Sequence, residues 1–245
     1  MGETGRTAGK TDPDTRVCLV TGVGPGTGRA IVEAYAGQGF QVAMLARSTD
    51  RLAEIEAETA GTHAYPCDVT EFDRLREVVD QISNELGVPD VIVHNAVGGA
   101  FGDVLSVDPE ALQRNFQVNT MALLHLTQAA APAMIERGTG AILCTGNTSA
   151  YRGKAGFAAF APTKAAQRIL AESMARHLGP LGIHVAYIAI DAVIDLEWTR
   201  KRMPDRPDGF FCKPADIAAE VLRISEQPRS AWSFESVIRP FGENW

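Results

Sequence analysis

Short apolar runs and longer helix-like segments succeed one another along almost the whole chain. The runs are rich in β-branched residues and nearly free of polar positions, which predicts buried strands. The predicted strands are Arg16–Gly22, Gln41–Arg47, His63–Val69, Asp90–Ala96, Gly140–Gly146, His184–Asp191 and Ser233–Arg239. The predicted helices lie at about Gly28–Gln38, Thr49–Thr59, Glu71–Leu86, Pro109–Arg137, Phe160–Leu178 and Pro214–Ser225.

This alternation predicts an α/β fold. Strands that are apolar throughout are typical of a parallel sheet covered on both faces, and repeated βα units imply right-handed crossovers. We expect a single-domain, Rossmann-type, doubly wound sheet of about seven parallel strands over residues 16–245, with helices on both faces. Residues 1–15 are polar and predict a mobile tail. The irregular stretch Ala192–Lys213 is long enough to be a substrate lid, at about residues 192–213.

Composition narrows the function. The chain has 245 residues, 22% of them charged, and a net charge of −7 without a Lys/Arg cluster, which argues against a nucleic-acid partner. It has no apolar run long enough for a membrane span and no export signal, so we expect a cytoplasmic protein. Its four cysteines and five histidines are scattered, and no metal site is predicted. A small molecule or another copy of the chain remains as partner.

A glycine-rich turn joins the first predicted strand to the first helix. Such a turn lets the backbone approach a pyrophosphate and directs the helix N-terminus at it. The candidate cofactor-binding residues are Thr21, Gly22, Gly24, Gly26, Thr27 and Gly28. After the second strand, where an acidic residue would select NAD, the sequence has Arg47, which can face a 2′-phosphate and favours NADP(H).

The spacing of Thr21, Gly22, Gly26 and Gly28 resembles the short-chain dehydrogenase/reductase family. Further motifs follow in the family's order. The resemblance implies that Asp68 and Val69 contact adenine, that Asn95 belongs to the turn after strand four, and that Asn119 holds a water in a proton relay. It also implies that Lys164 contacts the nicotinamide ribose and takes part in catalysis.

Two positions depart from the family's pattern. Phe160 lies four residues before Lys164, where the family has a Tyr that exchanges the substrate proton, and a phenyl ring has no such proton. Asn147 lies thirteen residues before Phe160, where the family has a catalytic Ser. The resemblance therefore implies a divergent member with catalytic positions Asn119, Asn147, Phe160 and Lys164.

Four other groups are candidates for the missing acid. Tyr151 precedes the Lys-bearing helix, and Ser149 lies two residues beyond the expected Ser. Asp191 and Asp195 flank the nicotinamide side of the predicted cleft and can act as acids if burial raises their pKa. Each also has a simpler explanation, as a loop residue, a turn hydroxyl or a solvated carboxylate.

The resemblance implies an NADP(H)-dependent oxidoreductase with an atypical active site. It would reduce a C=C, C=N or carbonyl group of a small, apolar substrate, since the first two need less from the Tyr position. Two alternatives stay open: a non-redox isomerase, dehydratase or cyclase on the same scaffold, and a catalytically inactive NADP(H)-binding protein. The family also pairs its long helices across twofold axes, which implies a homodimer or homotetramer.

Overall fold

Seven parallel strands form the centre of the molecule in the computed structural model, which describes residues 15–242. They are β1 (Val17–Thr21), β2 (Gln41–Ala46), β3 (Thr62–Pro66), β4 (Val91–His94), β5 (Gly140–Gly146), β6 (Ile183–Ile190) and β9 (Glu235–Ile238). Their order across the sheet is β3-β2-β1-β4-β5-β6-β9, and every neighbouring pair is parallel. This confirms the predicted doubly wound sheet: the chain starts at its middle, builds one half, and returns to build the other.

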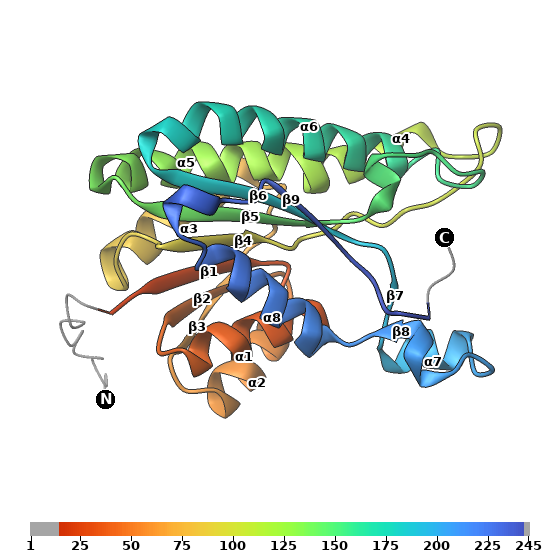
Figure 1. Cartoon of the computed structure of the whole chain (residues 1–245), viewed down its shortest axis with the longest axis horizontal. Helices are drawn as coiled ribbons and strands as arrows, with labels where there is room; N and C mark the ends of the chain where they lie inside the picture. The colour runs from red at the N-terminus through yellow and green to blue at the C-terminus, as the bar shows by residue number, and fades with distance from the viewer. Residues whose placement is uncertain (1–14, 243–245) are drawn as a thin grey trace, which may run out of the picture.

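Helices cover both faces of this sheet (Figure 1). Below it in this view lie α1 (Thr27–Gly37), α2 (Thr49–Glu58) and α8 (Pro214–Ser225). On the other face lie α3 (Phe72–Glu85), α5 (Ala122–Arg137) and α6 (Ala161–Leu178). Of the helices within residues 15–242, none is both long and apolar enough to cross a membrane.

Each central strand sends side chains into two hydrophobic cores. In β5, Ile142 and Cys144 pack with α3, α5 and α6, whereas Ala141 and Leu143 pack with α1, α2 and α8. Successive strand residues point to opposite faces of a sheet, so a strand covered on both faces must be apolar at every position. The continuous apolar runs of the sequence have this cause.

Two segments differ from the sequence-based expectation. The helix expected over 109–137 is divided into α4 (Pro109–Phe116) and α5 by a π-turn at Gln117–Met121. A π-turn adds a residue to one helical turn without changing the apolar character of the sequence, so the pattern does not reveal it.

The stretch 192–213, expected to be irregular, contains regular structure. It holds α7 (Glu197–Arg202) and two short strands, β7 (Val193–Ile194) and β8 (Phe211–Cys212), which pair with each other. Strands of two residues are too short to show an alternating pattern. The mobile tail expected at residues 1–15 falls, but for its last residue, outside the described residues.

Candidate active site

A cleft of about 840 Å³ opens at the carboxyl ends of β1 and β4, where the order of the strands reverses. Ligands of doubly wound sheets bind at this switch point. The glycine turn forms one wall, the segment 95–100 another, and Ile194 and Leu196 of the segment 192–213 close a third side. The volume is within the range of small-molecule sites, about 300–1,000 Å³.

Glycine is required at two positions of the turn by different constraints. Gly22 has a φ of +69°, and a β-carbon there would lie 2.4 Å from the Cα of Ala96. A β-carbon at Gly28 would lie 2.5 Å from the carbonyl oxygen of Gly22. A β-carbon at Gly24 would meet no atom of residues 15–242 within 4 Å, so only a ligand would need the small size of this residue. The backbone at Gly22 is therefore packed closely against the segment that follows β4, whereas the backbone at Gly24 is open.

Asn95 braces this turn from the neighbouring strand. Its Nδ2 donates to the carbonyl oxygen of Gly22 at 2.9 Å, and its Oδ1 accepts from the Thr145 hydroxyl at 2.9 Å. Thr21 is fully buried, with its Oγ1 3.1 Å from Nδ1 of His94. Thr21 is absent from the described cleft lining, so its predicted role becomes one of positioning the turn.

Thr27, the first residue of α1, carries an unsatisfied group. Its hydroxyl is buried and has no hydrogen-bond partner within residues 15–242, although Thr27 lines the cleft. Buried polar groups in folded proteins almost always have a partner. A phosphate oxygen at the N-terminus of α1 would provide one, because this end of a helix presents free N–H groups and positive potential. The glycine turn and Thr27 together fit the pyrophosphate of a dinucleotide.

The opposite end of the cleft is basic. Arg47 follows β2 with 82% of its side chain exposed, and its Nη1 lies 4.0 Å from Oδ2 of Asp68. Ser48 caps α2 by accepting from the backbone N–H of Arg51 at 3.4 Å. Ser48 and Arg51 line the cleft together with Arg47, Asp68 and Val69. Arg51 was not predicted as a site residue from the sequence, although it lies four residues after Arg47, a spacing of about one helical turn.

Asn119 lies inside the π-turn and is fully buried. Its Oδ1 accepts from the N–H of Gly98 at 2.9 Å, and its Nδ2 donates to the carbonyl oxygen of Gly98 at 3.0 Å and to the Thr163 hydroxyl at 2.8 Å. The side chain thus ties the cleft wall at Gly98 to the first turn of α6. Its neighbour Val118 lines the cleft, and Asn119 lies behind that wall.

Lys164 is buried, with 2% of its surface exposed, and has no carboxylate partner among the described ion pairs. Its Nζ donates to Oε1 of Gln167 at 2.9 Å. Burial lowers the pKa of Lys164 to about 8 from an ordinary 10.5. His94 is equally buried, and burial, aided by the charge of Lys164, lowers the pKa of His94 to about 3. The lysine therefore holds the positive charge in this region at neutral pH.

Phe160 occupies the position immediately before α6 and is 3% exposed. Its ring lies 4.8 Å from the ring of Phe101 and 6.3 Å from that of Phe157, measured between centroids. Nζ of Lys164 lies 5.9 Å from the centroid of the Phe160 ring. The three phenyl rings form an aromatic cluster, and none of them has an exchangeable proton.

Asn147 begins a single turn of 3-10 helix at Thr148–Ala150, and its Oδ1 accepts from the backbone N–H of Ser149 at 3.1 Å. Its own N–H donates to the hydroxyl of Tyr187 at 3.3 Å. The carbonyl group of this side chain is thus used within the turn. Its amide N–H groups have no described partner in the structure over residues 15–242.

The other candidate acids differ in their surroundings. The Tyr151 hydroxyl donates to Oε1 of Glu235, and burial raises the pKa of this tyrosine further above 10. Asp195 accepts two hydrogen bonds from Arg200, at 2.6 and 2.8 Å, which lower its pKa. Neither group is therefore suited to give up a proton at neutral pH. Asp191 accepts from the Thr148 hydroxyl at 2.5 Å.

The structure brings most predicted cofactor residues together. Lining the cleft are Gly22, Gly24, Gly26, Thr27, Gly28, Arg47, Asp68, Val69 and Asn95. The predicted catalytic residues Asn119, Asn147, Phe160 and Lys164 lie outside this lining set. Three groups missed from the sequence, Thr145, Thr163 and Gln167, hold Asn95, Asn119 and Lys164 in place. They lack a sequence signal because they are ordinary polar residues within regular elements.

Comparison with known proteins agrees with this geometry. The short chain dehydrogenase family model matches residues 16–204. L-xylulose reductase of the mouse is 32% identical over 217 residues, which cover 84% of this chain and 87% of the relative. Carbonyl reductase [NADPH] 2 of the pig, Sus scrofa, is 28% identical over 230 residues, covering 90% and 93%.

A solved structure gives the same result at the level of the fold. A metagenomic short-chain oxidoreductase in complex with NADP superposes with a TM-score of 0.81 at 26% identity, covering 93% of this chain and 98% of that one. The doubly wound sheet, the glycine turn at its switch point and the match over residues 16–204 lead to one conclusion: the chain belongs to the short-chain dehydrogenase family and is an oxidoreductase of that type.

Proposed function

We propose that the protein is an NADP(H)-dependent reductase whose active site lacks an acidic hydroxyl. The substrate would be a small, largely apolar molecule with a C=C, C=N or carbonyl group. The observation that carries this proposal is a contrast between two halves of the site. The cofactor cleft has the glycine turn, the basic end with Arg47, and Asn95, which supports the turn. Phe160, by contrast, packs in the aromatic cluster with Phe101 and Phe157.

The cofactor would be held along the length of the cleft. Thr27 and the N-terminus of α1 would bind the pyrophosphate, and Asp68 and Val69 would border the adenine. Arg47 and Arg51 would pair with the 2′-phosphate, because a guanidinium binds phosphate oxygens through paired hydrogen bonds. When bound, the nicotinamide supplies or accepts a hydride.

The proton step depends on what replaces the phenol. Phe160 cannot donate, and Tyr151 and Asp195 are engaged elsewhere. The Lys164 ammonium, poised by its buried position, stabilises negative charge, and Asn147 can donate through its amide. Either would stabilise a developing oxyanion, Lys164 through its positive charge and Asn147 through an amide N–H that is not acidic. An iminium ion is reduced by the hydride alone, and the enolate formed from a conjugated C=C would take its proton at carbon from water. Both groups therefore fit this site better than a simple ketone, whose alkoxide needs a proton from a nearby acid.

Calorimetry on ligand-free protein tests the cofactor half of the proposal. We expect micromolar binding of NADPH and NADP⁺ and weaker binding of NADH and NAD⁺. Turnover is then measured as NADPH oxidation with matched enone, iminium and ketone substrates, and we expect the first two to react faster. Absence of binding by all four nucleotides would refute the proposal. Tight binding without turnover of any substrate class would favour a catalytically inactive binding protein.

A further inference from the structure

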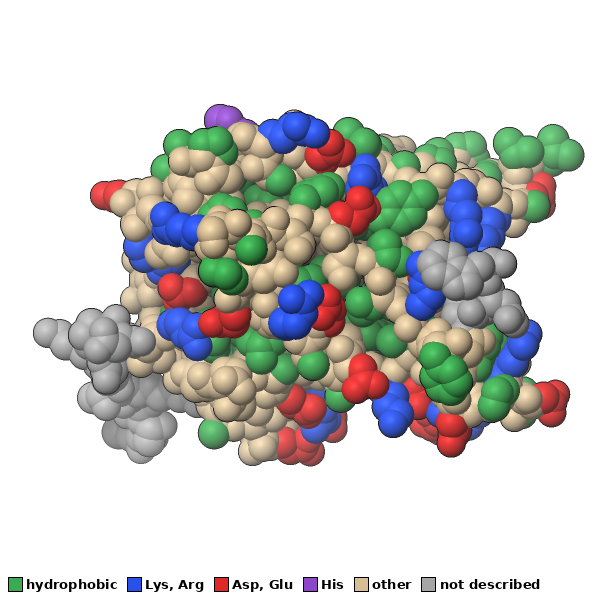
Figure 2. Space-filling view, in the orientation of Figure 1, with side chains coloured by type: hydrophobic (Ala, Val, Ile, Leu, Met, Phe, Trp, Pro, Cys, Tyr) green, Lys and Arg blue, Asp and Glu red, His purple; other side chains and the backbone are tan. Residues whose placement is uncertain are grey.

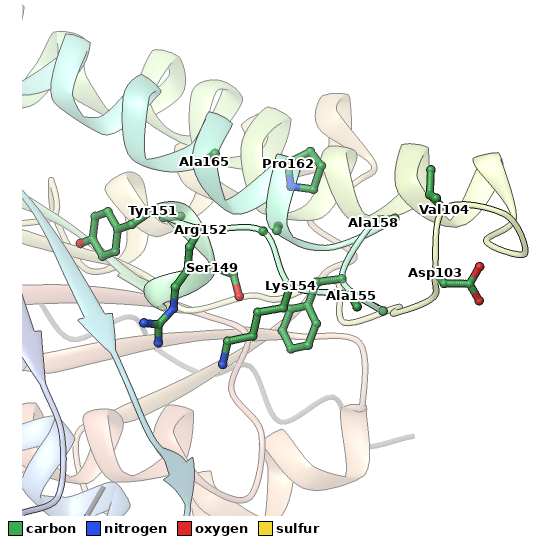
Figure 3. Close-up of a pocket in the computed structure, with 15 residues that line it drawn as sticks. Asp103, Val104, Ser149, Tyr151, Arg152, Lys154, Ala155, Ala158, Pro162 and Ala165 are labelled. Carbon is green, nitrogen blue, oxygen red and sulfur yellow. The ribbon is translucent and has the colours of Figure 1, made fainter. Parts of the chain in front are cut away.

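A second cavity, of about 600 Å³, lies beside the candidate active site (Figure 3). The loop 149–158, the first turns of α6 and the residues 103–104 enclose it. Its walls are mostly apolar and include Val104, Ala155, Phe157, Ala158, Pro162 and Ala165. Two cations, Arg152 and Lys154, interrupt them.

The two cations point in the same direction. Figure 3 shows the Arg152 guanidinium and the Lys154 ammonium extending side by side from the loop, away from α6 and towards the end of β6. The Lys154 Nζ lies 6.0 Å from the Phe157 ring centroid, so the charge stands over an apolar surface. Figure 2 shows Lys and Arg side chains gathered at this end of the molecule, between the upper helix layer and the lid.

Lys154 has no carboxylate partner among the described ion pairs, whereas Arg152 pairs with Asp191, which lies outside the cavity lining. Asp103, the one carboxylate in the described lining, accepts hydrogen bonds from the N–H groups of Leu105 and Ser106 and from the Ser106 hydroxyl. In Figure 3 its carboxylate points away from both cations. The described lining therefore holds two cations and one carboxylate, and that carboxylate faces neither cation.

The cavity adjoins the reaction centre through Asp191. This residue follows β6, and its Oδ1 lies 3.6 Å from Nη2 of Arg152. Its Oδ2 lies 3.9 Å from Nη1 of Arg239. Asp191 also accepts from the hydroxyl of Thr148, the residue that follows Asn147. Arg152 consequently connects the predicted catalytic turn with the cavity.

We propose that the substrate carries an anionic group on an apolar body, and that Arg152 and Lys154 bind the anion. The inference rests on the proposed function and adds a substrate class to it. A guanidinium matches the planar fork of a carboxylate and an ammonium adds a point charge, whereas the alanine, proline and phenylalanine walls accept the apolar body. A carboxylate and a phosphonate share this chemistry, and the experiment separates them.

The test compares benzoylacrylate, its methyl ester and the corresponding vinylphosphonate as enone substrates. Wild-type protein should show a KM at least about tenfold lower for an anionic probe than for the ester, because a charge-assisted contact is worth that much or more. Arg152→Gln with Lys154→Gln should abolish this difference by raising the KM of the anion, with little change for the ester. Arg74→Gln, on the exposed surface of α3, is the matched control. The anion with the lower KM identifies the preferred group.

Binding of an unreactive acid separates this inference from the proposed function. Phenylbutyrate and phenylbutyramide have no group to reduce, and calorimetry with NADP⁺-loaded protein measures them directly. If the acid binds, the amide does not, and the binding is lost when Arg152 is replaced, the inference is supported even if no enone is turned over. Equal binding of acid and amide, or an ester that is reduced as efficiently as the acid, overturns it while leaving reductase activity intact.

Discussion

Replacement of Lys164 by methionine should change how stability depends on pH. The lysine is buried, and its pKa falls from an ordinary 10.5 to about 8 because burial disfavours the charged form. At about 1.4 kcal/mol per pH unit, this difference corresponds to a destabilisation of about 3 kcal/mol whenever the amine is charged in both states.

The sign follows from proton binding. Below pH 8 the Lys164 amine is protonated in both the folded and the unfolded chain, so the folded protein carries the full destabilisation of about 3 kcal/mol. Between pH 8 and 10.5 only the unfolded chain holds it, so the wild-type protein becomes more stable as pH rises. Lys164→Met removes this gain. The stability of the variant relative to wild type should therefore fall by about 3 kcal/mol across this window.

Urea unfolding of ligand-free protein at several pH values from 7 to 10.5 measures this quantity. Tyrosines and cysteines also titrate here, but they do so in both proteins, and the difference between the two profiles isolates Lys164. Lys201→Met serves as control, because the Lys201 side chain is 74% exposed and its profile should parallel that of wild type. Parallel profiles for Lys164→Met as well would refute the reasoning, because they would mean that burial does not lower the pKa of this amine.

Three further predictions concern the cofactor and the chemistry. Arg47→Asp should weaken NADPH binding about tenfold or more and improve NADH binding, by calorimetry; an unchanged preference between the two would assign the 2′-phosphate to another group. Gly22→Ala should abolish cofactor binding and lower the melting temperature, because its β-carbon meets the backbone of Ala96, whereas Gly24→Ala should retain the wild-type melting temperature. Phe160→Tyr combined with Asn147→Ser should raise ketone reduction by about a hundredfold in steady-state assays; a folded, cofactor-binding variant without this gain would contradict the proposed roles of these positions.

The sequence predicted the sheet well because burial on both faces leaves a strong signal. Every position of β5 from Ala141 to Gly146 is buried, and the predicted and observed bounds of that strand coincide. The glycine turn was also predictable, since glycines spaced in this way between a strand and a helix have few other uses.

Other features depend on contacts between distant segments. Thr163 in α6 accepts from Asn119, which lies 44 residues earlier, and nothing in the local sequence distinguishes this threonine from a solvent-facing one. The orientation of the Tyr151 side chain depends on its hydrogen bond to Glu235, which lies 84 residues later. Such pairings follow from the packing of α6 against its neighbours, which no local pattern encodes.

Leu196 of the segment 192–213 lies against Gly26 of the glycine turn, and this contact bears on the order in which ligands bind. A β-carbon at Gly26 would lie 2.5 Å from Cδ2 of Leu196, so this side chain lies directly on the backbone proposed to bind phosphate. A dinucleotide bound at the proposed site would displace Leu196, and the segment 192–213 would then cover it. We therefore expect compulsory-order kinetics, with the nucleotide entering first and leaving last, and with lid opening rather than hydride transfer limiting turnover.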